Sequence, residues 1–132
     1  MEGIAIDWLA VVAATLSAFV VGGLWYGPLF GKTWMQALAL REDDLGKRNM
    51  PMVFGVALLL SLVAAINLAA FIGPDAGIGF GTAAGFAAGF GWVGMFLGIL
   101  YLFERRPLKA WAINAGYCTL ALTLMGLILG AW

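Results

Sequence analysis

The sequence predicts an all-α integral membrane protein of four transmembrane helices, and three observations support this fold class. The chain of 132 residues is 64% hydrophobic and only 11% charged, whereas a soluble domain is typically about half apolar and about a quarter charged. Its apolar residues gather in four uncharged runs, each close to the roughly 20 residues that a helix needs to cross a bilayer. Short connections join the runs, so residues 1–132 are expected to form a single transmembrane domain. The predicted spans are about 8–26, 52–72, 78–103 and 110–131.

Each run is expected to be helical, because the bilayer offers no water to unpaired backbone groups. A membrane β-barrel would require alternating polar and apolar positions, and the runs show none. Glu2 and Asp7 precede the first run, where a secretory signal would carry basic residues, so this run is expected to be a retained helix. Asp7, directly before Trp8, is expected to cap that helix.

The basic residues predict the orientation of the chain. All seven lysines and arginines fall in the connections after the first and third spans. Short basic loops stay in the cytoplasm, so both termini are predicted to lie outside. The basic residues are Lys32, Arg41, Lys47 and Arg48 in the first of these connections, and Arg105, Arg106 and Lys109 in the second.

The connection after the first span is expected to contain a short helix of its own. Gly27-Pro28 is expected to end the first transmembrane helix. Within the segment 29–40, Phe30, Trp34 and Leu38 follow one another at helical spacing. This pattern predicts a short helix that lies in the membrane interface.

Glycines spaced mostly by four residues mark the third span. Such a row lets another helix approach closely and gain dispersion contacts. Two interpretations remain open: packing inside one bundle, or contact between subunits of a homo-oligomer. The glycines are Gly77, Gly81, Gly85, Gly89, Gly94 and Gly98.

Several classes of function are disfavoured by what the chain lacks. No acidic or basic residue lies inside a span, which argues against a proton-coupled carrier. There is no histidine, and Cys118 is the single cysteine, so neither a catalytic constellation nor a metal site is expected. We therefore expect no enzyme and no cofactor. The formal net charge of zero does not suggest a nucleic-acid partner.

The polar residues near and within the spans suggest one candidate site. Asn114 lies close to the inner end of the fourth span, level with the ends of the first and third. We hypothesise a cluster there that cradles a lipid headgroup or a small anion. In the alternative interpretation, Glu104 pairs with an arginine and the other residues only anchor helix ends. The cluster comprises Tyr26, Glu104, Arg105, Asn114 and Tyr117.

Two further polar side chains lie within spans. Asn67 is a candidate polar site in the outer part of the second span. An interhelical hydrogen bond is its simplest role. Trp92 lies in the middle of the third span, where its indole N–H needs a partner.

Two motifs resemble a known family. The first is the stretch 24–35, LWYGPLFGKTWM, and the second is 103–109, FERRPLK, followed by Asn-Ala-Gly-Tyr at 114–117 and Met-Gly at 125–126. Together they resemble a bacterial family of small four-helix membrane proteins catalogued as domain of unknown function number 1761. The resemblance implies a fold, a topology and a location in a bacterial inner membrane, but no activity. Family members often carry a histidine after the Gly-Tyr pair, where this chain has Cys118. The residues that carry the resemblance are Trp25, Tyr26, Gly27, Pro28, Phe30, Gly31, Trp34, Asn114, Gly116 and Tyr117.

The leading functional interpretation is a membrane protein that self-associates and interacts with lipid or with a partner membrane protein. The alternative is a passive channel or facilitator for a small uncharged or weakly charged solute, with Asn67, Trp92 and Asn114 along its path. The two predict different structures. A facilitator needs polar residues that face a common cavity, whereas a packing protein buries each asparagine in a separate helix contact.

Overall fold

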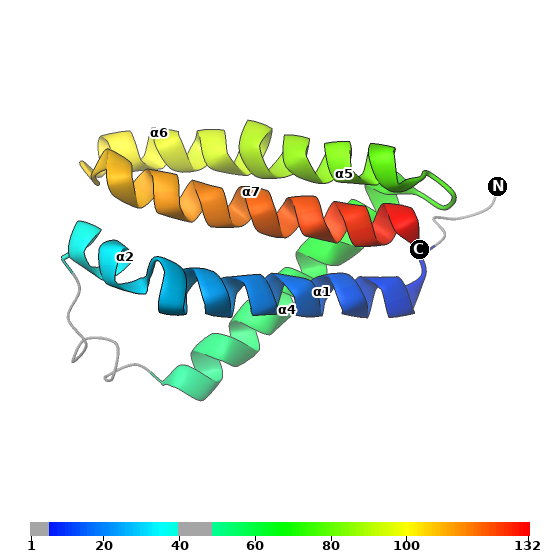
Figure 1. The fold of residues 1–132 in the computed structure, drawn as a ribbon, viewed down its shortest axis with the longest axis horizontal. Coiled ribbons are helices and arrows are strands. Elements are labelled where there is room, and N and C mark those ends of the chain that lie inside the picture. The colour runs from blue at the N-terminus through cyan, green and yellow to red at the C-terminus, as the bar shows by residue number, and fades with distance from the viewer. Residues whose placement is uncertain (1–5, 40–48) are drawn as a thin grey trace.

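The computed structural model describes residues 6–39 and 49–132, which form a bundle of four long helices (Figure 1). This part of the chain contains no strand. Two of the long helices include π-helical segments, labelled η. The order is α1 (Trp8–Leu24), η1 (Trp25–Leu29), α2 (Gly31–Ala37), α4 (Met50–Ile72), α5 (Ile78–Phe86), η2 (Ala87–Gly94), α6 (Met95–Phe103) and α7 (Leu108–Ala131).

The predicted fold class is confirmed. Four helices are long and apolar enough to cross a membrane: Trp8–Leu29, Met50–Ile72, Ile78–Phe103 and Leu108–Ala131. The second and fourth begin two residues earlier than the apolar runs predicted. The earlier start of α4 is explained by its N-cap, because the Asn49 side chain accepts a hydrogen bond from the Met52 amide at 3.2 Å. Pro51 occupies the first turn, where no N–H is needed.

The predicted cap of α1 is also confirmed. The Asp7 carboxylate accepts hydrogen bonds from the amides of Leu9, at 3.0 Å, and Ala10, at 3.3 Å. These are two of the amides that a helix start leaves without an intrahelical partner.

The expectation that Gly27-Pro28 ends the first helix is wrong. The Phe30 amide donates to the Trp25 carbonyl at 2.8 Å, a bond that spans five residues and belongs to a π turn. Proline lacks the N–H that a regular helical turn would use. Here Pro28 lies inside the wider π turn, so the helix continues past it. The short helix predicted for 29–40 is observed as α2, over Gly31–Ala37. Residue 40 and the basic residues Arg41, Lys47 and Arg48 lie outside the described residues.

The glycine row brings the third and fourth spans together at backbone distance. A Cβ atom placed on Gly81, Gly85 or Gly89 would lie closer than 3.0 Å to backbone atoms of α7. Further along, Gly98 faces the indole ring of Trp111, and Gly94 has the Ala115 side chain in van der Waals range. The row is therefore used for packing within this chain.

The core lies in one half of the bundle, where α1, α4 and α7 meet. It is built mostly from alanine, so these helices also pack closely. Its α4 members all come from the C-terminal half of that helix. The core residues are Val11, Ala14, Ala18, Ala65, Leu68, Ala69, Ile72, Ala121 and Met125.

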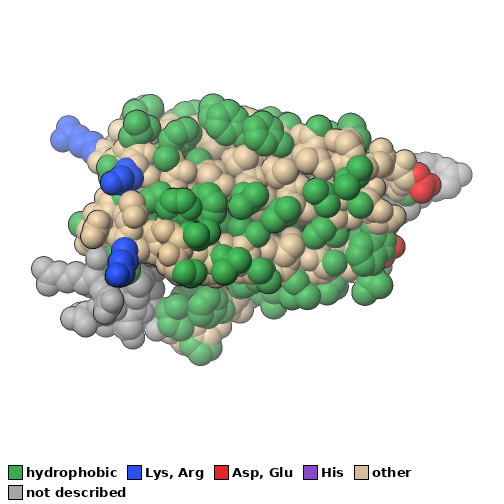
Figure 2. Space-filling model, in the orientation of Figure 1, with side chains coloured by type: hydrophobic (Ala, Val, Ile, Leu, Met, Phe, Trp, Pro, Cys, Tyr) green, Lys and Arg blue, Asp and Glu red, His purple; other side chains and the backbone are tan. Residues whose placement is uncertain are grey.

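The N-terminal half of α4 diverges from the bundle. Figure 1 shows α4 crossing α1 obliquely, with its beginning set apart from the other helices. From Pro51 to Leu60 every side chain but that of Ala57 is exposed in the isolated chain. The divergence leaves an opening at the end where Lys and Arg side chains gather, opposite the end that shows acidic side chains in red in Figure 2. We call the former the basic end.

We predict opposite outcomes for the same substitution at two glycines of the third span. Gly85→Ala should lower the free energy of unfolding by roughly 1–3 kcal/mol, because the new methyl group meets the α7 backbone. Gly91→Ala is the matched control, since nothing lies within 4 Å of a Cβ at that position. It should leave the stability unchanged or slightly higher. Thermal unfolding in detergent would measure both, and an equal effect of the two would contradict this packing.

Candidate functional site

A cavity of about 1050 Å³ opens at the basic end, where α4 diverges from α1 and α7. We call it the basic-end cavity. Apolar side chains of α1 and α4, among them Phe19, Val53, Phe54 and Ala57, line it together with Gly22 and Gly23. Nothing lies within 4 Å of a Cβ atom built on Gly23, so this glycine leaves the α1 wall open, whereas Gly22 packs against the Tyr117 ring. The polar side chains along its lining include Tyr26, Trp34, Ser61, Arg105, Arg106, Asn114 and Tyr117.

A chain of hydrogen bonds joins three spans beside this cavity. The Tyr26 hydroxyl of η1 donates to Asn114 Oδ1 of α7 at 2.6 Å. Asn114 Nδ2 in turn donates to the Tyr101 hydroxyl of α6, also at 2.6 Å. An amide in hydrocarbon needs such partners to offset its loss of water. The Asn114 amide keeps one further N–H that neither bond uses.

Three aromatic rings pack edge to face around the same point. The Tyr26 ring lies 5.1 Å from the Trp34 ring and 5.3 Å from the Tyr117 ring, centroid to centroid. The Tyr117 hydroxyl donates to the Ala18 carbonyl at 3.2 Å, which ties α7 to α1. Among the described residues, Trp34 Nε1 is the one buried side-chain polar atom without a hydrogen-bond partner.

Close contacts hold the first family motif against α7. Trp25 Nε1 donates to the Ile113 carbonyl at 2.8 Å, and a Cβ on Gly116 would lie 2.9 Å from the Trp25 ring. Gly31 allows the turn between η1 and α2, because a Cβ there would collide with the Tyr26 carbonyl. The two motifs, separated by about 80 residues in the sequence, therefore meet in space.

The connection between α6 and α7 places two arginines on the cavity. Arg106 Nε donates to Glu104 Oε1 at 2.6 Å, and its guanidinium lies 5.2 Å from the centre of the Tyr101 ring. Arg105 adopts a left-handed conformation, with φ of 58°. Its side chain forms no ion pair with any residue that the structure describes.

The structure brings four of the five predicted cluster residues to the basic-end cavity. They are Tyr26, Arg105, Asn114 and Tyr117. Glu104 does not line the cavity; it pairs with Arg106 at the helix end. Sequence reasoning missed the role of Tyr101. Sequence spacing gave no clear signal, because Tyr101 lies two residues before the end of α6 and Asn114 lies six residues after the start of α7.

The other predicted polar residues lie elsewhere. Asn67 is exposed, and its Nδ2 donates to the Val63 carbonyl of its own helix at 3.0 Å. Trp92 is 70% exposed, and no hydrogen bond of its indole N–H occurs among the described residues. Neither lines the basic-end cavity, so the three residues that a facilitator was expected to use do not face a common space in this chain.

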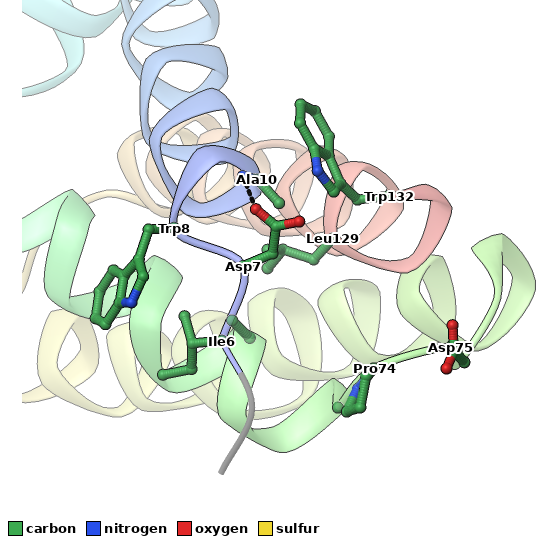
Figure 3. A pocket seen from close by; sticks show the side chains of 10 residues that line it. Ile6, Asp7, Trp8, Ala10, Pro74, Asp75, Leu129 and Trp132 are labelled. Carbon is green, nitrogen blue, oxygen red and sulfur yellow. Dashed lines mark hydrogen bonds between the residues drawn. The ribbon is translucent and has the colours of Figure 1, made fainter.

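A second pocket, of about 560 Å³, lies at the opposite end (Figure 3). Asp7, Asp75 and Trp132 are among its lining residues. Asp7 is engaged as the cap of α1, and Figure 3 shows Asp75 apart from it, on the connection between α4 and α5. The two carboxylates do not converge on one point, so this pocket is the weaker candidate.

The hydrogen bond between Tyr26 and Asn114 should be measurable as a coupling energy. In a double-mutant cycle of Tyr26→Phe and Asn114→Ala, we expect about 0.6 kcal/mol and at most about 1.7 kcal/mol, as for other hydrogen bonds between membrane helices. Thr123→Val replaces Asn114→Ala in the control cycle, because Thr123 Oγ1 bonds only to its own helix, at the Thr119 carbonyl. A coupling in the control as large as in the test cycle would argue against a direct interaction.

Comparison with known proteins identifies a family. The family model described as "Protein of unknown function (DUF1761)" matches residues 9–130. No curated protein and no solved structure matches the chain. The two motifs that carried the resemblance, 24–35 and 103–126, both lie within the matched region. Since the match covers nearly the whole length, the chain belongs to the DUF1761 family of proteins of unknown function.

Proposed function

We propose that this protein binds a membrane lipid in the basic-end cavity. In this proposal the acyl chain lies along the apolar walls of α1 and α4, and the polar part of the lipid lies beside Asn114 and Arg105. The observation that carries the proposal is the cavity itself, which at about 1050 Å³ is as large as the pockets that bury whole small molecules.

The distribution of residues along the cavity supports a ligand with one apolar and one polar end. Phe19, Val53 and Phe54 come from parts of α1 and α4 that carry no charge. Arg105 and Arg106 lie at the helix ends, where the chain leaves the apolar region. An amphiphile matches both regions, whereas a water-soluble solute would face apolar walls over much of the space.

The position of α4 supports entry from the side. Only the C-terminal half of α4 packs into the core, through residues such as Ala65 and Ala69. Its N-terminal half borders the cavity without closing onto α1. Protein interiors are normally packed as densely as organic crystals, so an opening of this size is not expected to stay empty. Inside the membrane, lipid chains are the molecules at hand to fill it.

Filling the apolar part of the cavity should remove the bound lipid. Ala57→Phe places a ring in the space between α4 and α1, and we expect the fraction of chains that retain a lipid to fall about tenfold, which corresponds to about 1.4 kcal/mol. Val56→Phe is the matched control, because Val56 is the neighbouring residue and does not line the cavity. Native mass spectrometry of the purified protein would count the bound lipids. If both variants retained lipid equally, the basic-end cavity would not be the site of lipid binding.

Self-association is a second candidate, favoured by the position of Asn67. This side chain faces outward from an apolar helix, and its Oδ1 accepts no hydrogen bond from a described residue. Asparagine on a membrane-facing surface finds partners across helices. A second copy of the chain can supply the same residue, in a symmetric contact.

Asn67→Leu should therefore have effects of opposite sign on the monomer and on the oligomer. The monomer should become slightly more stable, because an amide leaves an apolar surface. The dimer fraction, measured by energy transfer between labelled chains in liposomes, should fall. Val63→Leu changes the same face of α4 without removing a polar group and should leave the dimer fraction unchanged. An Asn67→Leu protein that associates as the wild type does would refute this contact.

A further inference from the structure

The lining of the basic-end cavity suggests which class of lipid it accepts. We infer that the cavity selects lipids with a net negative, phosphate-containing headgroup, and that Arg105 is the residue that recognises the charge. This inference rests on the proposed lipid binding and goes further, because a cavity that only held acyl chains would be indifferent to the headgroup.

The first argument is the balance of charge. Arg105 and Arg106 line the cavity, and no aspartate or glutamate is among the described residues that do so. Glu104 neutralises Arg106, which leaves the Arg105 guanidinium as a positive charge without a counter-ion in the described structure. A cationic group on a headgroup would find no carboxylate among the described residues that line the cavity.

The second argument is the supply of hydrogen-bond donors. Asn114 Nδ2 donates one N–H to Tyr101 and keeps a second N–H for a ligand, while the Asn114 oxygen, which accepts from Tyr26, keeps one lone pair. The guanidinium of Arg105 offers only donors, in a planar fork that matches phosphate oxygens. Donors from both residues suit a ligand rich in acceptor oxygens, and a phosphodiester is the anionic group of this kind in membrane lipids.

The third argument is the backbone of Arg105. The Arg105 amide donates to the Leu102 carbonyl at 3.3 Å, and the Arg106 amide donates to the Tyr101 carbonyl at 2.9 Å. This is the Schellman arrangement, in which the left-handed position is usually glycine. An arginine there, with φ of 58°, is held in a conformation that side chains disfavour. Non-glycine residues in such conformations concentrate at binding sites. The turn would form more easily with glycine, so the local fold gives no reason for an arginine side chain here.

The strain allows a test that separates binding from folding. Arg105→Gly removes the charge and at the same time relieves the backbone, so the variant should unfold at a higher temperature than the wild type. Its lipid selectivity should nevertheless be lost. Arg105→Lys keeps the charge and should retain part of the selectivity. Asp75→Gly is the matched control, because Asp75 has φ of 57° at the opposite end of the bundle. It removes one charge and the same kind of strain without touching the cavity.

The measurement is a competition between two lipids with identical acyl chains. The delipidated protein in detergent receives equal amounts of phosphatidylglycerol, which is anionic, and phosphatidylcholine, which is zwitterionic, and native mass spectrometry counts the two complexes. We expect the wild type and Asp75→Gly to prefer phosphatidylglycerol about tenfold, as one charge-assisted contact would give. Arg105→Gly should bind the two lipids equally.

The possible results distinguish this inference from the proposed function. If the wild type binds both lipids equally and Ala57→Phe removes both, the cavity holds lipid and the inference on the headgroup is overturned. If neither lipid binds, both proposals fall. Retained selectivity in Arg105→Gly would overturn the role of Arg105. Displacement of phosphatidylglycerol by millimolar inorganic phosphate would assign the site to a free anion and overturn recognition of a lipid.

Discussion

The contact between the backbones of the third and fourth spans sets the positions of the other elements. Because Gly81, Gly85 and Gly89 carry no side chains, α5 and η2 lie directly against α7. This contact fixes the register of the two helices, so that Tyr101 and Asn114 come level and Trp111 Nε1 reaches the Gly94 carbonyl at 2.8 Å. The hydrogen-bond chain that continues to Tyr26 therefore depends on glycines far from it. In lipid, close contact of this kind replaces the hydrophobic effect as the force between helices.

The basic-end cavity follows from an uneven distribution of side-chain size along α4. Ala65 and Ala69, in the C-terminal half, let the helix approach Ala14 and Ala18 of α1. The N-terminal half carries large residues instead, with Phe54 facing the cavity. A helix that can approach its neighbour along only half its length must cross it at an angle. At the same end, η1 and α2 follow α1 and precede α4. They bring Tyr26 and Trp34 to the cavity.

Three features were predictable from the sequence because they depend on local properties. The spans follow from uninterrupted apolar length, the cap of α1 follows from Asp7, and the close packing of the third span follows from its glycine spacing. The continuation of the helix through Pro28 was not, since proline usually breaks regular turns and a π turn has no sequence signature of its own. Nor could the sequence predict which side of α4 faces the bundle. Helices that are apolar all round carry no periodic signal for their buried face. Tyr26, Asn114 and Tyr117 could be grouped by depth alone, whereas the pairing of Glu104 with Arg106 depends on the exact helix end.

The oblique path of α4 also gives the molecule unequal cross-sections in the two leaflets. At the end near Asp7 and Asp75 the four helices pack together, whereas at the basic end α4 stands apart (Figure 1). The outline of the protein, with the basic-end cavity inside it, is therefore wider in the leaflet at the basic end than in the other leaflet. A tapered body of this kind acts on the bilayer as a wedge, and its fit depends on the spontaneous curvature of the surrounding lipid.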